Sequence, residues 1–135
     1  MFYEYNDVES LEAAVREAGS DLAAIFASPI KHDTFVDQEL PNPEYARSGS
    51  RVLCDEHGAL LIVDDVRAGF RLARDCSWSL VNVKPDLSTW GKAIANGHPI
   101  SALWAPTSPA SQPPPSTRPA RSGSRPRRWP PRWRH

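Results

Sequence analysis

Two features of the sequence combine residue types that could do chemistry together. The apolar run 59–63 leads directly into Asp64 and Asp65, and Lys92 follows Gly91 in a short turn. A lysine in a tight, partly apolar turn loses hydration, and its neutral amine can then attack an aldehyde to form a Schiff base. A carboxylate at the end of a buried strand is suited to pairing with one fixed cation, such as a protonated pyridine nitrogen. These are the two groups that a protein supplies to pyridoxal-phosphate chemistry.

A helix and a strand are expected before these residues. Asn6 and Asp7 offer a side-chain cap, apolar residues then recur at spacings of three and four up to Ala18, and Gly19 offers a stop. The apolar run 22–27 that follows predicts a strand that is buried on both faces, as strands of parallel sheets are.

The same alternation repeats in the next part of the chain. A loop is expected over 30–43 and a second helix over 44–57, with Val52 and Leu53 facing inward and Gly58 as its end. The apolar run that leads into the two aspartates is the strongest strand signal in the chain. This rhythm predicts an α/β fold with a mostly parallel sheet. Ligands of such sheets bind beyond the carboxyl ends of the strands, where the doubled aspartate lies.

The segments after the doubled aspartate are harder to assign. Residues 83–87 indicate the start of a strand, 88–93 a turn and 97–99 another turn, which leads into the apolar segment 100–105. Beyond it, residues 106–135 contain seven arginines and no acidic residue, whereas all sixteen acidic residues of the 135-residue chain precede them. With almost no aliphatic side chains to bury, this tail is expected to be disordered.

Composition excludes several other classes of protein. Cys54 and Cys76 have no second cysteine nearby in the sequence, so a structural zinc site is not expected. Both cysteines are expected to be reduced thiols. His32, His57 and His98 show no metal-ligand spacing. The acidic N-terminus does not resemble a signal peptide and no apolar stretch is long enough to span a bilayer, so a cytoplasmic location is expected.

The order of motifs resembles a known family over residues 5–105, most specifically between Cys54 and Gly97. The stretches 54–71 and 84–92 are similar to class III aminotransferases, and the closest subgroup is glutamate-1-semialdehyde 2,1-aminomutase and its relatives. That family shows a strand ending in Asp-Glu-Val, then Thr-Gly-Phe-Arg, Pro-Asp and a Gly-Lys turn.

The resemblance implies a fold, a cofactor and two site residues. The fold would be part of the fold-type-I large domain, and the cofactor pyridoxal 5'-phosphate. Lys92 would form the internal Schiff base and carry protons, while Asp64 would pair with the pyridine nitrogen. The substrate would be an amino acid or amino-aldehyde, and the family's shared active site implies a homodimer. Transaminase and aminomutase use the same two residues, so the motifs do not separate these reactions.

The chain also departs from the family pattern. Ser28-Pro29 and Lys31-His32-Asp33 stand where the family commonly has Glu-Pro and a nearby Asn. Family members are about two to three times as long, and we expect the segment that binds the cofactor phosphate and the C-terminal domain to be missing. The predicted organisation is a partial cofactor-binding domain over 1–105 and the tail over 106–135, with little or no activity in this chain alone.

The basic tail allows a different interpretation. Arginines interleaved with prolines, Trp129 and Trp133 could bind nucleic acid or anionic surfaces without sequence specificity, which would make the chain a non-catalytic remnant. The competing hypothesis is that GC-rich DNA is translated here in the wrong frame or through an intron. An aminotransferase sequence in another frame of the DNA beyond codon 105 would favour the second hypothesis.

Overall fold

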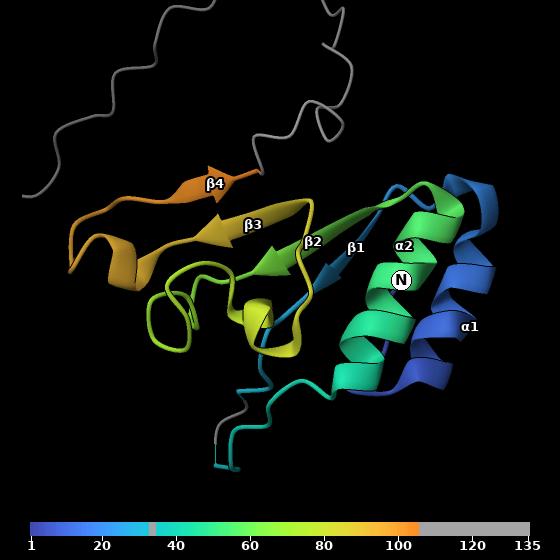
Figure 1. The fold of residues 1–135 in the computed structure, drawn as a ribbon, viewed down its shortest axis with the longest axis horizontal. Helices are drawn as coiled ribbons and strands as arrows, with labels where there is room; N and C mark the ends of the chain where they lie inside the picture. Colours follow the sequence, from blue (N-terminus) through green and yellow to red (C-terminus); the bar gives the residue numbers. More distant parts are fainter. Residues whose placement is uncertain (33–34, 106–135) are drawn as a thin grey trace, which may run out of the picture.

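A four-stranded sheet organises the protein, of which the computed structural model describes residues 1–32 and 35–105 (Figure 1). The strands lie side by side in chain order, the first two pairings are parallel and the last is antiparallel. They are β1 (Ala24–Ala27), β2 (Leu60–Asp64), β3 (Leu87–Trp90) and β4 (Ala102–Trp104). The predicted α/β class with a mostly parallel sheet is confirmed, and the expected tail over 106–135 lies outside the described residues.

The first helix begins and ends as the sequence indicates. α1 (Val8–Ala18) starts where the Asp7 side chain accepts a hydrogen bond from the backbone N–H of Ser10 at 2.9 Å. It ends at Gly19, whose φ of +54° is readily adopted only by glycine. The short helix η1 (Gly19–Asp21) then leads to β1.

The second helical segment has a different inward face from the one expected. It consists of a π-helix, η2 (Tyr45–Arg51), followed by α2 (Val52–His57), which Gly58 ends at a φ of +64°. Val52 is exposed and Leu53 only partly buried, so the prediction that both face inward was wrong for Val52. The wider π turn rotates a different set of residues toward the sheet. This set is Tyr45, Ala46, Gly49, Ser50 and Cys54.

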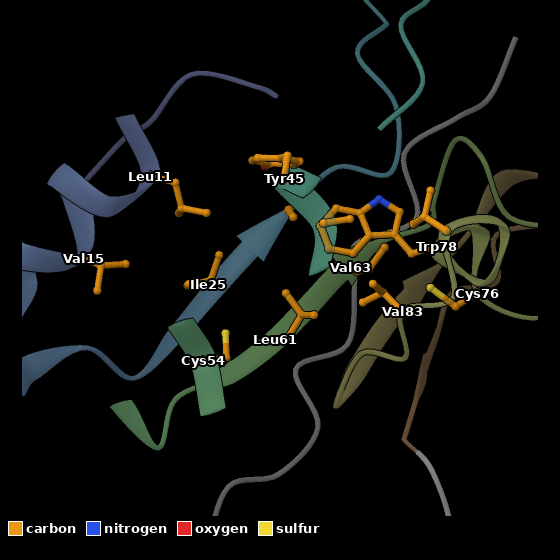
Figure 2. Packing of buried hydrophobic residues seen from close by; sticks show 13 residues of the cluster. Leu11, Val15, Ile25, Tyr45, Cys54, Leu61, Val63, Cys76, Trp78 and Val83 are labelled. Carbon is orange, nitrogen blue, oxygen red and sulfur yellow. The ribbon is translucent and has the colours of Figure 1, made fainter. Parts of the chain in front are cut away.

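The hydrophobic core lies between these helices and one face of the sheet (Figure 2). Leu61 and Val63 of β2 are fully buried. Around them pack side chains from α1, β1 and the helical segment before β2, and the ring of Tyr45 meets the ring of Trp78 edge-on, with 6.0 Å between centroids. Trp78 belongs to the short helix η3 (Ser77–Val81). Burial of these apolar side chains fixes the sheet on the helices.

The opposite face of β1 is open. Ile25 and Ala27 are buried, but the ring of Phe26 between them is 55% exposed. The expectation that this strand is buried on both faces is therefore wrong for the described residues, because the helices among them pack on one face only.

The sequence placed a turn where the third strand lies. Residues 88–93 were expected to turn, yet β3 continues to Trp90 before the short helix η4 (Lys92–Ile94). Ser88 and Thr89 are polar, but Ser88 is buried, where its hydroxyl accepts a hydrogen bond from Trp90 Nε1 at 2.8 Å. The turn expected near Gly97 is present, with the N–H of His98 donating to the Ala95 carbonyl at 3.0 Å.

Candidate active site

The two predicted site residues follow neighbouring parallel strands at the same edge of the sheet. Asp64 is the last residue of β2, in register with Thr89 of β3. Lys92 comes three residues after Thr89, as the first residue of η4. The structure thus places Asp64 and Lys92 at the carboxyl edge, where sheets of this kind bind ligands.

The carboxylate of Asp64 is held in one orientation. Its Oδ1 accepts hydrogen bonds from the hydroxyl of Thr89 at 3.0 Å and from the backbone N–H of Val66 at 3.1 Å. No donor from residues 1–32 or 35–105 reaches Oδ2. Because a carboxylate oxygen accepts about two hydrogen bonds, Asp64 retains capacity for a further donor.

The adjacent Asp65 has a structural role. Its side chain is 1% exposed and accepts from the backbone N–H of Ser77 at 3.0 Å (Oδ2) and 3.3 Å (Oδ1). Successive residues at a strand end point to opposite sides, so only Asp64 remains at the partly exposed edge. Asp65 instead ties the start of η3 to the end of β2.

Lys92 lies in a strained turn but is exposed to solvent. Its φ is +45°, a region that costs about 1–3 kcal/mol for residues other than glycine. Its exposure contradicts the expectation that the turn removes water from the amine. The sequence correctly indicated a turn at Lys92, whereas the degree of burial depends on contacts that local sequence does not reveal.

A cavity of about 290 Å³ opens beside Lys92. Its walls come from the segments that follow β1, β2 and β3. Asp64 is not among the lining residues, so this cavity does not itself join the two predicted site residues. The side chains that line it are Ile30, His32, Gln38, Arg67, Ala68, Arg71, Leu72 and Lys92. Sequence reasoning missed Arg67 and Arg71, although their place just after a strand end was an available signal.

Trp90 packs behind the turn that carries Lys92. The indole is 7% exposed and contacts the ring of Phe70, with centroids 4.8 Å apart. A Cβ on Gly69 would lie 2.4 Å from Trp90 Cζ3, so the ring rests directly on the glycine backbone. Its burial supports a role in filling space behind the site.

The two cysteines and His57 take structural positions. Cys54 is free and buried, and burial raises the pKa of its thiol to about 11, which makes it a poor nucleophile. Cys76 is also free, and burial raises its pKa as well. His57 Nδ1 lies 3.0 Å from the Leu53 carbonyl, within hydrogen-bond distance. Within the described part of the chain, no three His, Cys, Asp or Glu side chains gather as metal ligands.

Comparison with protein families shows which family the chain belongs to. The family model described as aminotransferase class-III matches residues 3–124. The chain belongs to the class III aminotransferases. The match also extends past residue 105, where the sequence alone suggested that the resemblance ends, so the domain boundary at 105 stays a prediction.

Individual relatives of the class III aminotransferases agree with this assignment. The chain is 58% identical over 102 residues to the aminopentol aminotransferase of Sphingopyxis macrogoltabida, covering 76% of this chain and 24% of the relative. It is 44% identical over 98 residues to the glutamate-1-semialdehyde 2,1-aminomutase of Desulforamulus reducens, covering 73% and 22%. The predicted resemblance to both kinds of enzyme is confirmed. The chain spans about a quarter of the length of these relatives.

A solved structure supports the fold and the cofactor. The FumI protein of Sphingopyxis sp. MTA144, in its pyridoxal-phosphate internal aldimine form, superposes with a TM-score of 0.75 at 55% identity, covering 79% of this chain and 26% of that one. The described residues have part of the fold of fold-type-I enzymes, as the resemblance implied, and pyridoxal phosphate is the cofactor of the family. No helix in the described ranges is long and apolar enough to cross a membrane.

Proposed function

We propose that this chain is part of the cofactor-binding domain of an enzyme that transfers amino groups, with Lys92 and Asp64 as its two cofactor residues. The observation that carries the proposal is their placement after neighbouring parallel strands, at one edge of the sheet. The residues fit pyridoxal phosphate chemically: one exposed amine for its aldehyde, and one oriented carboxylate with an oxygen still open to a donor.

Each residue has a separate task in this proposal. When bound, the cofactor withdraws electrons from the substrate carbon that carries the amino group. The Nζ atom of Lys92 would hold the cofactor through its aldehyde and, once freed, would carry a proton as general acid and base. Asp64 Oδ2, which has no donor among the described residues, would accept a hydrogen bond from the protonated ring nitrogen and stabilise its charge. The hydroxyl of Thr89 keeps the carboxylate turned toward that donor.

The relatives guide the choice between the two possible reactions. Identity is higher to the aminopentol aminotransferase than to the aminomutases. We therefore propose transfer between two substrates, an amine and a keto acid, rather than migration within one molecule. An amino-polyol amine is the first donor to test. A homodimer and a cytoplasmic location are proposed from the family alone.

Chemical labelling of the 135-residue chain tests the assignment of Lys92. Mixing the chain with pyridoxal phosphate and reducing with borohydride is expected to place the label on Lys92, with Lys31 and Lys84 as internal controls. The label is expected to disappear in Lys92→Ala, and turnover with an amino donor to stay small or undetectable. A label spread evenly over the three lysines contradicts the proposal, and rapid turnover contradicts the expected lack of activity.

Neutralising Asp64 tests the second residue. Asp64→Asn keeps the size of the side chain and an acceptor for Thr89 and Val66, but removes the charge. We expect cofactor retention to weaken about tenfold, which corresponds to the loss of one charge-assisted hydrogen bond. Absorbance titration with pyridoxal phosphate measures the change. Asp21→Asn, an exposed aspartate after α1, is the matched control and is expected to bind as the unmodified chain does.

A further inference from the structure

The charges around the cavity beside Lys92 have one sign. Among the described residues, its lining contains the three cations Arg67, Arg71 and Lys92, together with the imidazole of His32, and no aspartate or glutamate. Among the described residues, neither arginine forms an ion pair with an acid. Three positive groups around one hollow repel each other in the absence of an anion.

The geometry of the cavity suits a small oxyanion. Arg71 Nη1 donates to the backbone carbonyl of Arg67, which anchors one end of that guanidinium and leaves its other N–H groups for a ligand. Ile30, Ala68 and Leu72 supply an apolar part of the wall, and Ile30 and Ala68 are buried. A guanidinium recognises planar oxyanions through paired hydrogen bonds.

We propose that this cavity is an oxyanion subsite, in which Arg67 and Arg71 bind the carboxylate of the keto acid or amino acid that exchanges the amino group. The subsite rests on the proposed function only in that Lys92 is the reacting amine. The subsite makes the two arginines specificity-determining residues. They increase the affinity for substrates that carry a carboxylate, and they do not increase the affinity for an amine that lacks one. Phosphate has related chemistry, so the cofactor's own phosphate is the competing source of the anion.

Binding of simple anions to the 135-residue chain tests the subsite without any turnover. The probes are propionate and inorganic phosphate, titrated by NMR chemical shifts in the absence of cofactor. Arg67→Gln and Arg71→Gln are each expected to weaken propionate binding about tenfold, the effect of one charged hydrogen bond. Arg74→Gln is the matched control, because Arg74 lies in the same loop but lines a different cavity. Propionate binding by Arg74→Gln is expected to change less than about twofold, since exposed charges at a distance are screened by salt.

A second titration separates the two sources of the anion. After pyridoxal phosphate is fixed at Lys92 with borohydride, propionate is expected to bind still, and the arginine variants to take up cofactor normally. The opposite outcome is that propionate no longer binds once pyridoxal phosphate is fixed, and that both arginine variants take up cofactor poorly. That result overturns the carboxylate assignment and shows that the cavity binds the cofactor phosphate. Equal anion binding by all variants with unchanged circular dichroism overturns the subsite. A third outcome is that the reduced cofactor labels another lysine while anion binding still depends on Arg67 and Arg71. That result refutes the proposed function but supports the subsite.

Discussion

Gly69→Ala is expected to destabilise the protein by about 3 kcal/mol, at the upper end for overpacking a core. The new Cβ would lie 2.4 and 2.5 Å from two atoms of the Trp90 ring and 2.8 Å from the Asp65 carbonyl oxygen. The ring has little freedom to retreat, because it is buried and its Nε1 donates to Ser88. Urea unfolding followed by far-UV circular dichroism measures the loss, which we expect as a lower midpoint.

Another glycine provides the control for this substitution. Gly49 lies in the π-helix, and a Cβ there would be 3.4 Å from Leu11 and 3.6 Å from Val8, which is ordinary contact. Gly49→Ala is expected to be neutral or to stabilise by up to about 1 kcal/mol, since alanine loses less backbone entropy in a helix. If Gly69→Ala and Gly49→Ala unfold at the same urea concentration, the close packing of Trp90 on Gly69 is refuted.

The second large effect is expected at Asp86, which joins β2 to the helix before it. Asp86 Oδ2 accepts from the Leu61 backbone N–H at 2.8 Å and from Arg51 Nη1 at 2.9 Å. Burial acts to lower the pKa of Arg51, but hydrogen bonds and charges from Asp86 and Asp55 outweigh it and raise the pKa. The side chains of Arg51 and Asp86 are only 22% and 26% exposed. Asp86→Ala removes both acceptor contacts and is expected to cost about 3 kcal/mol in urea unfolding.

Two further variants separate the effect of charge from that of the hydrogen bond. Asp86→Asn keeps an acceptor for Leu61 and is expected to cost about half as much. The ion pair of Arg16 and Glu12, at 3.4 Å with side chains 69% and 47% exposed, is the surface reference. Glu12→Gln there is expected to change stability by less than about 0.5 kcal/mol. A loss at Asp86→Ala no greater than at Glu12→Gln would show that the partly buried pair contributes nothing.

The parts of the fold that could be predicted are those set by local chemistry. Asp7 caps α1 and Gly58 ends α2 because capping depends on a few adjacent residues. The strand before Asp64 is recognisable because all its residues are apolar. The third strand was expected too early, at 83–87, and a turn was expected in its place because Ser88 and Thr89 are polar; their pairing with β2 and β4 is a tertiary effect. The inward face of the second helix was missed because α periodicity does not describe a π turn.

In the candidate site, too, some features follow from the local sequence and others arise only from tertiary contacts. The apolar strand placed Asp64 at the carboxyl edge of the sheet, and the family resemblance paired it with Lys92. That Lys92 follows the neighbouring parallel strand is visible only in the structure. The different role of Asp65 follows from the alternation of side chains at the strand end. Arg67 and Arg71 were missed because their significance arises only when the loops after three strands meet around a cavity. Solvent exposure of Lys92 likewise depends on neighbours far away in the sequence.

The hydrogen bonds that hold Asp64 have a consequence for how the substrate range of such an enzyme can change. The carboxylate of Asp64 is already hydrogen-bonded to Thr89 and Val66 in the absence of a ligand. Ligand binding therefore costs no free energy for ordering this side chain. The cationic side chains around the neighbouring hollow are long and exposed. If the proposed roles hold, substitutions among these cations would change which molecules are accepted, while Asp64, the proposed partner of the cofactor ring, stays in place.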